Sequence, residues 1–164
     1  MVAATQESIE GLQRANQATA RLLRELAALA RPGITTGELN DYAMYYMTQL
    51  GAEPVFHTEE GFPGCINTSI NDAAVHGVPG NQRLKIGDVL SIDAGMLLGD
   101  YAGDSTITVA IGKVSPKHQY LIDTTYGAMM AGIRAARPGG RIGNPESVAQ
   151  RKPARQSGCT QCRS

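Results

Sequence analysis

Residues 89–111 read VLSIDAGMLLGDYAGDSTITVAI and predict two strands that pair with each other. The segment 89–98 is rich in apolar residues, and in 105–111 branched apolar residues alternate with threonine and alanine. Alternation with a period of two is typical of a strand with one buried face. Gly99 and Asp100 lie between the two segments and favour a tight turn. The stretch therefore predicts an antiparallel hairpin.

Helices are predicted on both sides of this hairpin. Apolar residues recur at helical spacing in 6–30, 36–50 and 116–136. The short apolar segments 65–70 and 73–76 are further strand candidates. We expect the three helices to pack on one face of an antiparallel sheet that the strands form. The predicted fold class is α+β.

Composition and charge exclude several functional classes. The chain has 164 residues, of which 42% are hydrophobic and 18% charged, and its formal net charge is zero. Such a chain has no general attraction for nucleic acid or an anionic membrane. No apolar run reaches the roughly 18 residues of a membrane span. The N-terminal segment is amphipathic rather than a signal peptide, which predicts a cytoplasmic protein.

Two aspartates stand out because the predicted hairpin brings them together. Asp93 lies inside the apolar first strand, and Asp104 precedes the second. If the hairpin turns symmetrically about Leu98 and Gly99, the two residues lie directly opposite each other, with Cβ atoms about 5 Å apart. Two carboxylates at that distance favour a shared proton or a cation between them. The alternative is a hydrogen-bonded strand residue at Asp93 and an exposed turn residue at Asp104.

A histidine at the end of a predicted strand is a third polar candidate. His76 is followed by Gly77 and Pro79, which favour a turn. Imidazole nitrogen and carboxylate oxygen together suit divalent transition metals, whereas an isolated histidine is more often structural or exposed. We expect His76 to lie on the same side of the sheet as Asp93 and Asp104.

Three segments in a fixed order resemble the signatures of type I methionine aminopeptidases, which have the creatinase-like pita-bread fold. They are GFPGCINTSINDAAVHGVP at 61–79, LKIGDVLSIDAG at 84–95 and YAGDST at 101–106. The segment RPGITTGEL at 31–39 is also similar to that family. The resemblance covers about residues 7–143. It implies the first half of a pita-bread fold and the first helix of its second half.

The resemblance implies roles for four residues. Asp93 and Asp104 match metal-ligating aspartates, and two divalent ions (Co, Mn, Fe or Zn) are implied as cofactors. His76 matches a catalytic histidine that contacts the substrate near the scissile amide, and Phe62 lies in a substrate-binding segment. The implied reaction removes methionine from the N-terminal peptide of newly made proteins, in the cytoplasm and in proximity to the ribosome.

The chain departs from the family pattern in two places. An aromatic residue that helps to wall the methionine pocket is replaced by Glu59, which is followed by Glu60, so the side-chain specificity stays open. A later histidine and two glutamates that complete the family's metal site have no counterpart, since Glu146 is the last acidic residue and no histidine follows His118. We therefore expect the chain by itself to be truncated and inactive. The alternative is a non-catalytic pita-bread module that binds a partner.

The sequence changes character near Asn144. Residues 144–164 contain two prolines, almost no large apolar residue and no periodicity. This composition predicts an irregular or disordered basic tail after a partial aminopeptidase domain at 1–143. A reading-frame change at the gene end and a natural disordered tail both fit the tail. Cys159 and Cys162 form a lone Cys-x-x-Cys without the second pair that a zinc site needs.

Overall fold

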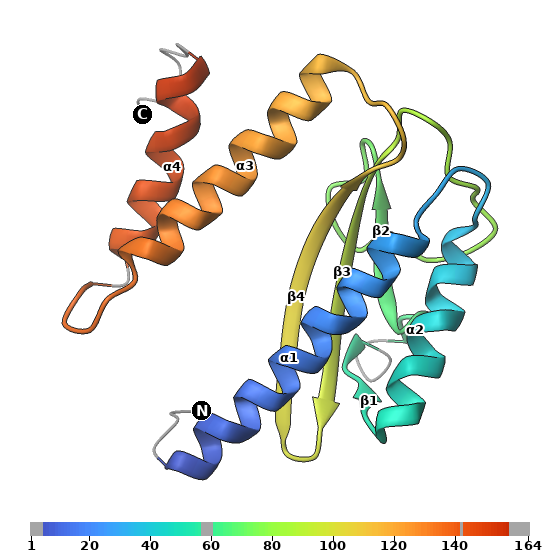
Figure 1. Cartoon of the computed structure of the whole chain (residues 1–164), viewed down its shortest axis with the longest axis horizontal. Coiled ribbons are helices and arrows are strands. Elements are labelled where there is room, and N and C mark those ends of the chain that lie inside the picture. Colours follow the sequence, from blue (N-terminus) through green and yellow to red (C-terminus); the bar gives the residue numbers. More distant parts are fainter. Residues whose placement is uncertain (1–4, 57–60, 142, 158–164) are drawn as a thin grey trace. The chain divides into compact units, whose positions relative to one another are not determined.

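The computed structural model describes residues 5–56, 61–141 and 143–157 (Figure 1). The chain divides into two compact units, Met1–Val114 and Ser115–Ser164. Among the described residues, the first unit holds two helices and a four-stranded sheet, and the second unit holds two helices. This combination confirms the predicted α+β class.

Two capped helices begin the first unit. Helix α1 spans Gln6–Leu29, and a threonine side chain caps its N-terminus. Helix α2 spans Thr36–Leu50 and begins with a capping box, in which Thr35 and Glu38 each bond to the other's free backbone N–H. Gly51 ends α2 in the left-handed conformation (φ 64°), which a residue without a Cβ adopts readily.

Strand β3, Val89–Leu98, is the centre of an antiparallel sheet. Strand β4, Tyr101–Ala110, pairs with β3 along its whole length. Strand β2, Ile66–Ile70, pairs with the N-terminal part of β3 on its other edge, and the short strand β1, Glu53–Pro54, pairs with the C-terminal end. Every described strand therefore bonds to β3, which sets the register of the whole sheet.

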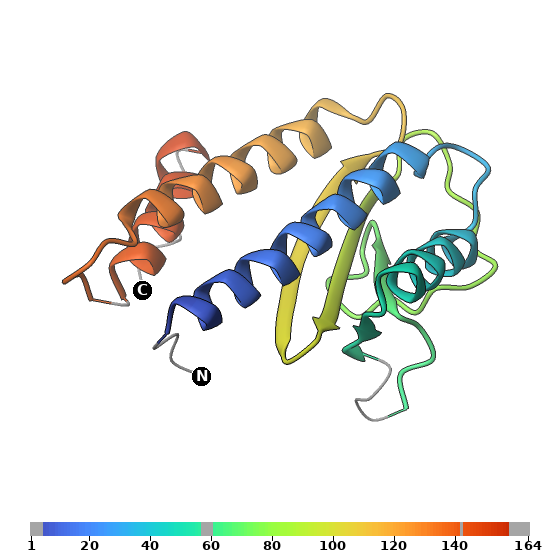
Figure 2. The same ribbon diagram turned by 60° about the horizontal axis from the view of Figure 1, so that its bottom comes forward.

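One face of the sheet packs against α1 and α2 in a single hydrophobic core. Leu90, Ile92 and Met96 alternate along β3 and are fully buried, and they share this core with Leu22 and Leu26 of α1. Figures 1 and 2 show α1 lying across β3 and β4. The residues between these apolar positions point to the opposite face of the sheet, and that face carries the polar side chains of the candidate site.

Helix α1 lies directly on Gly103 of β4. A Cβ atom at this position would lie 2.5 Å from the carbonyl oxygen of Ala15 and 2.6 Å from Oγ1 of Thr19. Both distances are well inside van der Waals contact. The missing side chain at Gly103 therefore allows the helix backbone to approach the strand.

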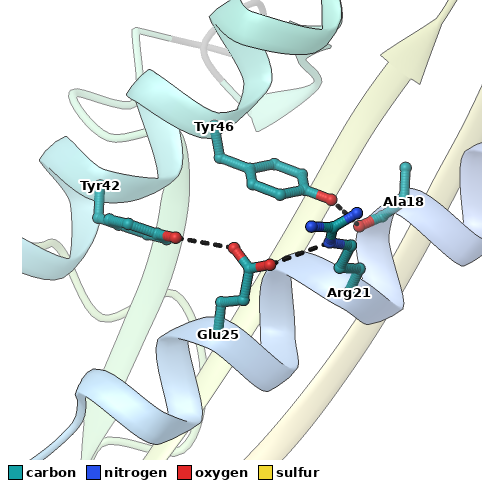
Figure 3. Close-up of polar contacts among 5 residues, drawn as sticks. All are labelled: Ala18, Arg21, Glu25, Tyr42 and Tyr46. Atoms are coloured by element: carbon teal, nitrogen blue, oxygen red, sulfur yellow. Dashed lines mark hydrogen bonds and ion pairs between the residues drawn. The ribbon is translucent and has the colours of Figure 1, made fainter.

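A group of polar side chains links α1 to α2 (Figure 3). The hydroxyl of Tyr42 donates a hydrogen bond to Oε2 of Glu25 at 2.7 Å, and Nε of Arg21 donates to Oε1 at 3.0 Å. The hydroxyl of Tyr46 donates to the carbonyl oxygen of Ala18 at 3.4 Å. The bond from Tyr42, and next the bond from Arg21, hold the pKa of Glu25 below its ordinary value.

The second unit contains two helices that pack on each other. Helix α3 spans Pro116–Ala135, with Ser115 as its N-cap before a proline in the first turn, and helix α4 spans Gly143–Ser157. Gly132 of α3 lies close to α4, because a Cβ there would be 3.3 Å from the carbonyl oxygen of Pro145 and 3.6 Å from Cβ of Ala149. A small residue at this point lets the two helices approach each other.

The sheet differs from the sequence-based prediction in its details. Residues 73–76 form no strand, and His76 has a left-handed backbone (φ 56°) that does not continue an extended segment. Strand β4 starts at Tyr101 rather than at residue 105, because β3 offers it pairing partners as far as Leu98. Of the three predicted helices, α1 and α2 lie in the same unit as the sheet, whereas α3 belongs to the second unit.

Residues 144–157 form most of helix α4, where an irregular tail was predicted. Pro145 lies at the start of the helix, where its missing N–H removes no helical hydrogen bond. Glu146 in the first turn interacts favourably with the helix dipole. The close approach of Ala149 to Gly132 adds a tertiary contact that the local sequence pattern does not reveal.

We predict that Gly103→Ala lowers the free energy of unfolding by about 1–3 kcal/mol, because the added methyl group overlaps the backbone of α1. Gly80→Ala is the matched control, since a Cβ at that residue would meet nothing within 4 Å. Urea denaturation followed by circular dichroism measures both variants. If Gly103→Ala is as stable as Gly80→Ala, the added methyl group at residue 103 does not overlap the backbone of α1.

A second prediction concerns the pH dependence of the α1–α2 contact. The pKa of Glu25 is lowered in the folded chain, so its contribution to stability is present above the ordinary value of 4.5 and is lost as the pH falls through the lower, folded pKa. Tyr42→Phe should lower the free energy of unfolding by less than about 1 kcal/mol at pH 7, since the pair is screened by solvent, and by a smaller amount at pH 2, where protonation of Glu25 weakens the bond.

Tyr45→Phe is the control for this experiment, because Tyr45 lies on the same helix with 61% of its surface exposed. Chemical denaturation at both pH values gives the two differences. A loss for Tyr42→Phe that is the same at pH 7 and pH 2 would mean that the ionised Glu25 carboxylate does not strengthen the bond.

Candidate metal site

Two adjacent rows of polar side chains cross β2, β3 and β4 on the face opposite the helices. The register places them in these rows: Asn67, Asp93 and Thr106 in one, and Ser69, Ser91 and Thr108 in the next. Alternate residues of a strand point to the same side, so all six side chains share one face. The hydroxyls of Ser91 and Thr108 are bonded to each other at 3.0 Å.

Asp93 is held by hydrogen bonds from both neighbouring strands. Nδ2 of Asn67 donates to its Oδ2 at 3.1 Å, and Oγ1 of Thr106 donates to its Oδ1 at 2.8 Å. Asp93 is half-buried, while Asn67 is only 4% exposed. The carboxylate therefore has one neutral donor on each oxygen, and the strands on both sides of β3 fix its position.

Asp104 lies opposite Gly95, two residues along β3 from the position of Asp93. The predicted direct opposition of the two aspartates is therefore wrong. The turn is formed by Gly99 and Asp100, one residue later than assumed, and Gly99 adopts the left-handed φ (62°) that a two-residue connection requires. Because the resulting shift is an even number of residues, both aspartates still point to the same face. They are diagonal neighbours, a relation in which Cβ atoms are typically about 7 Å apart.

The two carboxylates interact electrostatically. The pKa of Asp104 is raised, first by partial burial and second by the negative charge of Asp93. Both causes disfavour the charged form of Asp104. A cation between the two groups would remove the repulsion, so the charge arrangement of this face fits a positively charged ligand.

His76 lines a pocket of about 80 Å³ together with Asp93. The loop that carries His76 is bound to β2, since the N–H of Thr68 donates to the carbonyl oxygen of Gly77 at 2.7 Å. In turn the N–H of Gly77 donates to Oγ of Ser69 at 3.1 Å. The structure therefore brings His76 to the same side as Asp93, and Ser69 of the second polar row holds the peptide that follows the histidine.

These residues supply only part of a metal site. Carboxylate oxygens suit a divalent ion, and Asp93 and Asp104 share one face. Within residues 5–56, 61–141 and 143–157, however, no three or more His, Cys, Asp and Glu side chains gather in a group that could hold a metal ion. A complete shell around a divalent ion needs further ligands.

The structure says less about the remaining predicted site positions. Phe62 is half-buried and does not line the pocket of Asp93. Glu59 and Glu60 lie outside the described residues. Phe56 was not predicted to lie near the site. Its ring would be 3.3 Å from a Cβ atom at Gly95, the residue that pairs with Asp104 across the two strands. Phe56 lies outside the periodic segments and motifs of the sequence, so no sequence signal indicated this contact.

Cys65 takes no part in this face. Cys65 is fully buried, and burial raises the pKa of its thiol to about 11. Its Sγ lies 3.3 Å from the backbone oxygen of Asn40. A buried thiol with a raised pKa is not a nucleophile at neutral pH. Cys159 and Cys162 lie outside the described residues.

Comparison with known proteins places this site in context. The sequence pattern of metallopeptidase family M24 matches residues 10–162. Methionine aminopeptidase 1 of Bacillus subtilis is 37% identical over 85% of the chain and 56% of its own length. Methionine aminopeptidase A of Synechocystis is 38% identical over 89% of the chain and 58% of its own length. The chain thus spans little more than half of the curated relatives that it matches.

Solved structures give the same result for the fold. The crystal structure of methionine aminopeptidase from Rickettsia prowazekii has a TM-score of 0.91 and 32% identity, covering 95% of this chain and 63% of its own. Prolidase from Pyrococcus furiosus, at 24% identity, shares the fold with a TM-score of 0.81. These likenesses confirm the predicted partial pita-bread fold.

None of the described helices is long and apolar enough to cross a membrane.

We predict that Asp93→Asn lowers the pKa of Asp104 towards its ordinary value without fully restoring it, because burial remains after the charge is removed. Carbon-detected NMR titration of the Asp104 carboxyl group, with a chelator present, measures the shift. Asp100→Asn is the control, since it removes a charge from the same hairpin that does not act on Asp104. An unchanged pKa in Asp93→Asn would show that the two carboxylates do not interact.

Proposed function

Because the chain belongs to metallopeptidase family M24, we propose that it carries part of the active site of a metalloaminopeptidase that removes N-terminal methionine from newly made proteins. The observation that carries this proposal is the position of Asp93 and Asp104 on one face of the β3–β4 hairpin, with His76 lining the pocket of Asp93. Relatives named methionine aminopeptidase support the choice of substrate.

We assign Asp93 and Asp104 as ligands of two divalent ions, with Co, Mn, Fe and Zn as the candidate elements. The raised pKa of Asp104 supports this assignment, since a cation would stabilise the charged form that burial and Asp93 disfavour. When bound, such ions polarise a peptide carbonyl and make water a stronger nucleophile. The hairpin holds both carboxylates. Its register separates Asp93 and Asp104 by two residues, which places them on the same side of the sheet.

His76 is proposed to contact the substrate next to the scissile amide. The residue that follows it is held by the bonds of Gly77 to Thr68 and Ser69, and His76 lines the pocket of Asp93. From there it can donate a hydrogen bond to the reacting peptide group. Phe62 is proposed as an apolar contact for the substrate, on the resemblance alone.

The proposed partner is the N-terminal peptide of a nascent protein. Removal of methionine from such a peptide would take place in the cytoplasm and close to the ribosome. Formal net charge is zero, so neither nucleic acid nor a membrane surface is proposed as a general partner.

A second candidate function is a non-catalytic pita-bread module that binds a peptide. The observation that favours it is the small number of metal ligands, since no group of three or more such side chains occurs in the described part of the chain. The observation against it is the repulsion between Asp93 and Asp104. A module without a cation gains nothing from two carboxylates that disfavour each other's charge.

We predict that the 164-residue chain removes methionine from a Met-Ala peptide at least about 100-fold more slowly than a full-length relative, in the presence of Co²⁺ or Mn²⁺. The reason is the incomplete site: loss of a general base alone typically costs about 10²–10⁴-fold, and the described residues contain no group of three or more side chains that could hold a metal ion. Release of methionine, measured by chromatography at high protein concentration, gives the rate.

Asp104→Asn is the decisive variant in this assay. Residual, metal-dependent turnover that disappears in Asp104→Asn supports the aminopeptidase. Peptide binding that is unchanged by metal, by chelator and by Asp104→Asn, with no turnover, would support the binding module instead. Turnover equal to that of a full-length relative would contradict the expectation that the incomplete site slows the reaction.

A further inference from the structure

We propose that Asn67 and Thr106 are positioning residues, which orient the carboxylate of Asp93 for a divalent cation. The inference rests on the proposed function, because it concerns the same site. It goes beyond that function by assigning a role to two neutral residues that are not metal ligands themselves. The observation is one row of three side chains across β2, β3 and β4, with Asp93 at its centre.

The geometry of this row is specific. Asn67 donates from Nδ2 to Oδ2 of Asp93 at 3.1 Å, and Thr106 donates from Oγ1 to Oδ1 at 2.8 Å. Each oxygen therefore has one donor, and the two donors come from opposite sides of β3. A carboxylate held at one oxygen can still turn, whereas a carboxylate held at both oxygens has one preferred plane.

Fixing this plane matters because the terminal torsion of an aspartate is broad and roughly two-fold. Each oxygen of an ionised carboxylate offers about two acceptor positions, so one donor on each leaves further positions for a cation. The donors are neutral and do not add positive charge that would compete with the cation. Hydrogen-bonded partners of metal ligands typically contribute about 10–100-fold to metal affinity.

The burial of Asn67 indicates that its side chain depends on the hydrogen bond to Asp93. Its side chain is only 4% exposed, and a buried amide without a partner would destabilise the fold. Asn67 is also fixed by its place in β2, where it lies directly opposite Asp93 in the register. The donor is therefore in position before any cation arrives.

The second polar row provides an internal comparison. Thr108 lies two residues after Thr106 on the same strand and the same face, but its hydroxyl is bonded to Ser91 at 3.0 Å rather than to a carboxylate. Both threonines are exposed. Substituting each by valine removes one hydroxyl from nearly identical surroundings. Only one of the two variants affects Asp93.

The experiment is a titration of the full 164-residue chain with Mn²⁺, in which the electron paramagnetic resonance signal reports the free ion. Asn67→Leu and Thr106→Val should each weaken Mn²⁺ binding about 10-fold. Thr106→Ser keeps a hydroxyl and should restore the affinity. Thr108→Val, the matched control, should bind Mn²⁺ as the unaltered chain does. Thermal unfolding without Mn²⁺ should give Thr106→Val and Thr108→Val similar midpoints, which separates positioning from stability.

The outcomes distinguish this inference from the proposed function. If the unaltered chain binds Mn²⁺ and Asp93→Asn abolishes binding, while Thr106→Val and Asn67→Leu bind normally, the positioning role is overturned and the metal site stands. Equal losses in Thr106→Val and Thr108→Val also overturn it, because the effect is then not specific to Asp93. If the unaltered chain binds no Mn²⁺, the proposed assignment of Asp93 and Asp104 as metal ligands fails in this chain, and the positioning role fails with it.

Discussion

The pairing of β3 with its neighbours is the constraint on which the first unit depends. Its side chains alternate between a fully buried apolar face, with Leu90, Ile92 and Met96, and a polar face that includes Asp93. The apolar face secures α1 and α2, and the polar face carries the candidate site. One strand therefore links the stability of the core to the position of the carboxylate, and a shift of the strand by one residue would exchange the two faces.

The same alternation explains why an error in the predicted register left the site intact. The turn at Gly99 and Asp100 moves Asp104 by two residues relative to Asp93. An even shift keeps every side chain on its face, so the aspartates become diagonal rather than direct neighbours. Sequence could predict the hairpin, the helices and the shared face, because these follow from periodicity. It could not fix the register, which depends on the conformation of two turn residues.

Other features were beyond the sequence for different physical reasons. Helix α4 was missed because residues 144–164 contain almost no large apolar residue and no periodicity, and because Pro145 was counted against a helix although proline is favourable in the first turn. The bonds from Asn67 and Thr106 to Asp93 join residues that are 26 and 13 positions apart. Such pairs become visible only when the strands are aligned. The assignment of Asp93 and Asp104 as metal ligands likewise came from the resemblance, and it stays a proposal.

The polar face also shows how a fold can tolerate an unfavourable site. Burial and the charge of Asp93 disfavour the ionised form of Asp104, so in the absence of a cation the ionised Asp104 carboxylate opposes folding at neutral pH. The hydrophobic core on the other side of the same strands compensates for that cost. A cation that binds the folded chain and not the unfolded chain would reverse the sign of the contribution, since binding to the native state alone adds stability. Whether the carboxylate pair stabilises or destabilises the folded chain therefore depends on a bound cation. In the proposed metal site, this dependence would distinguish Asp93 and Asp104 from two ordinary surface carboxylates.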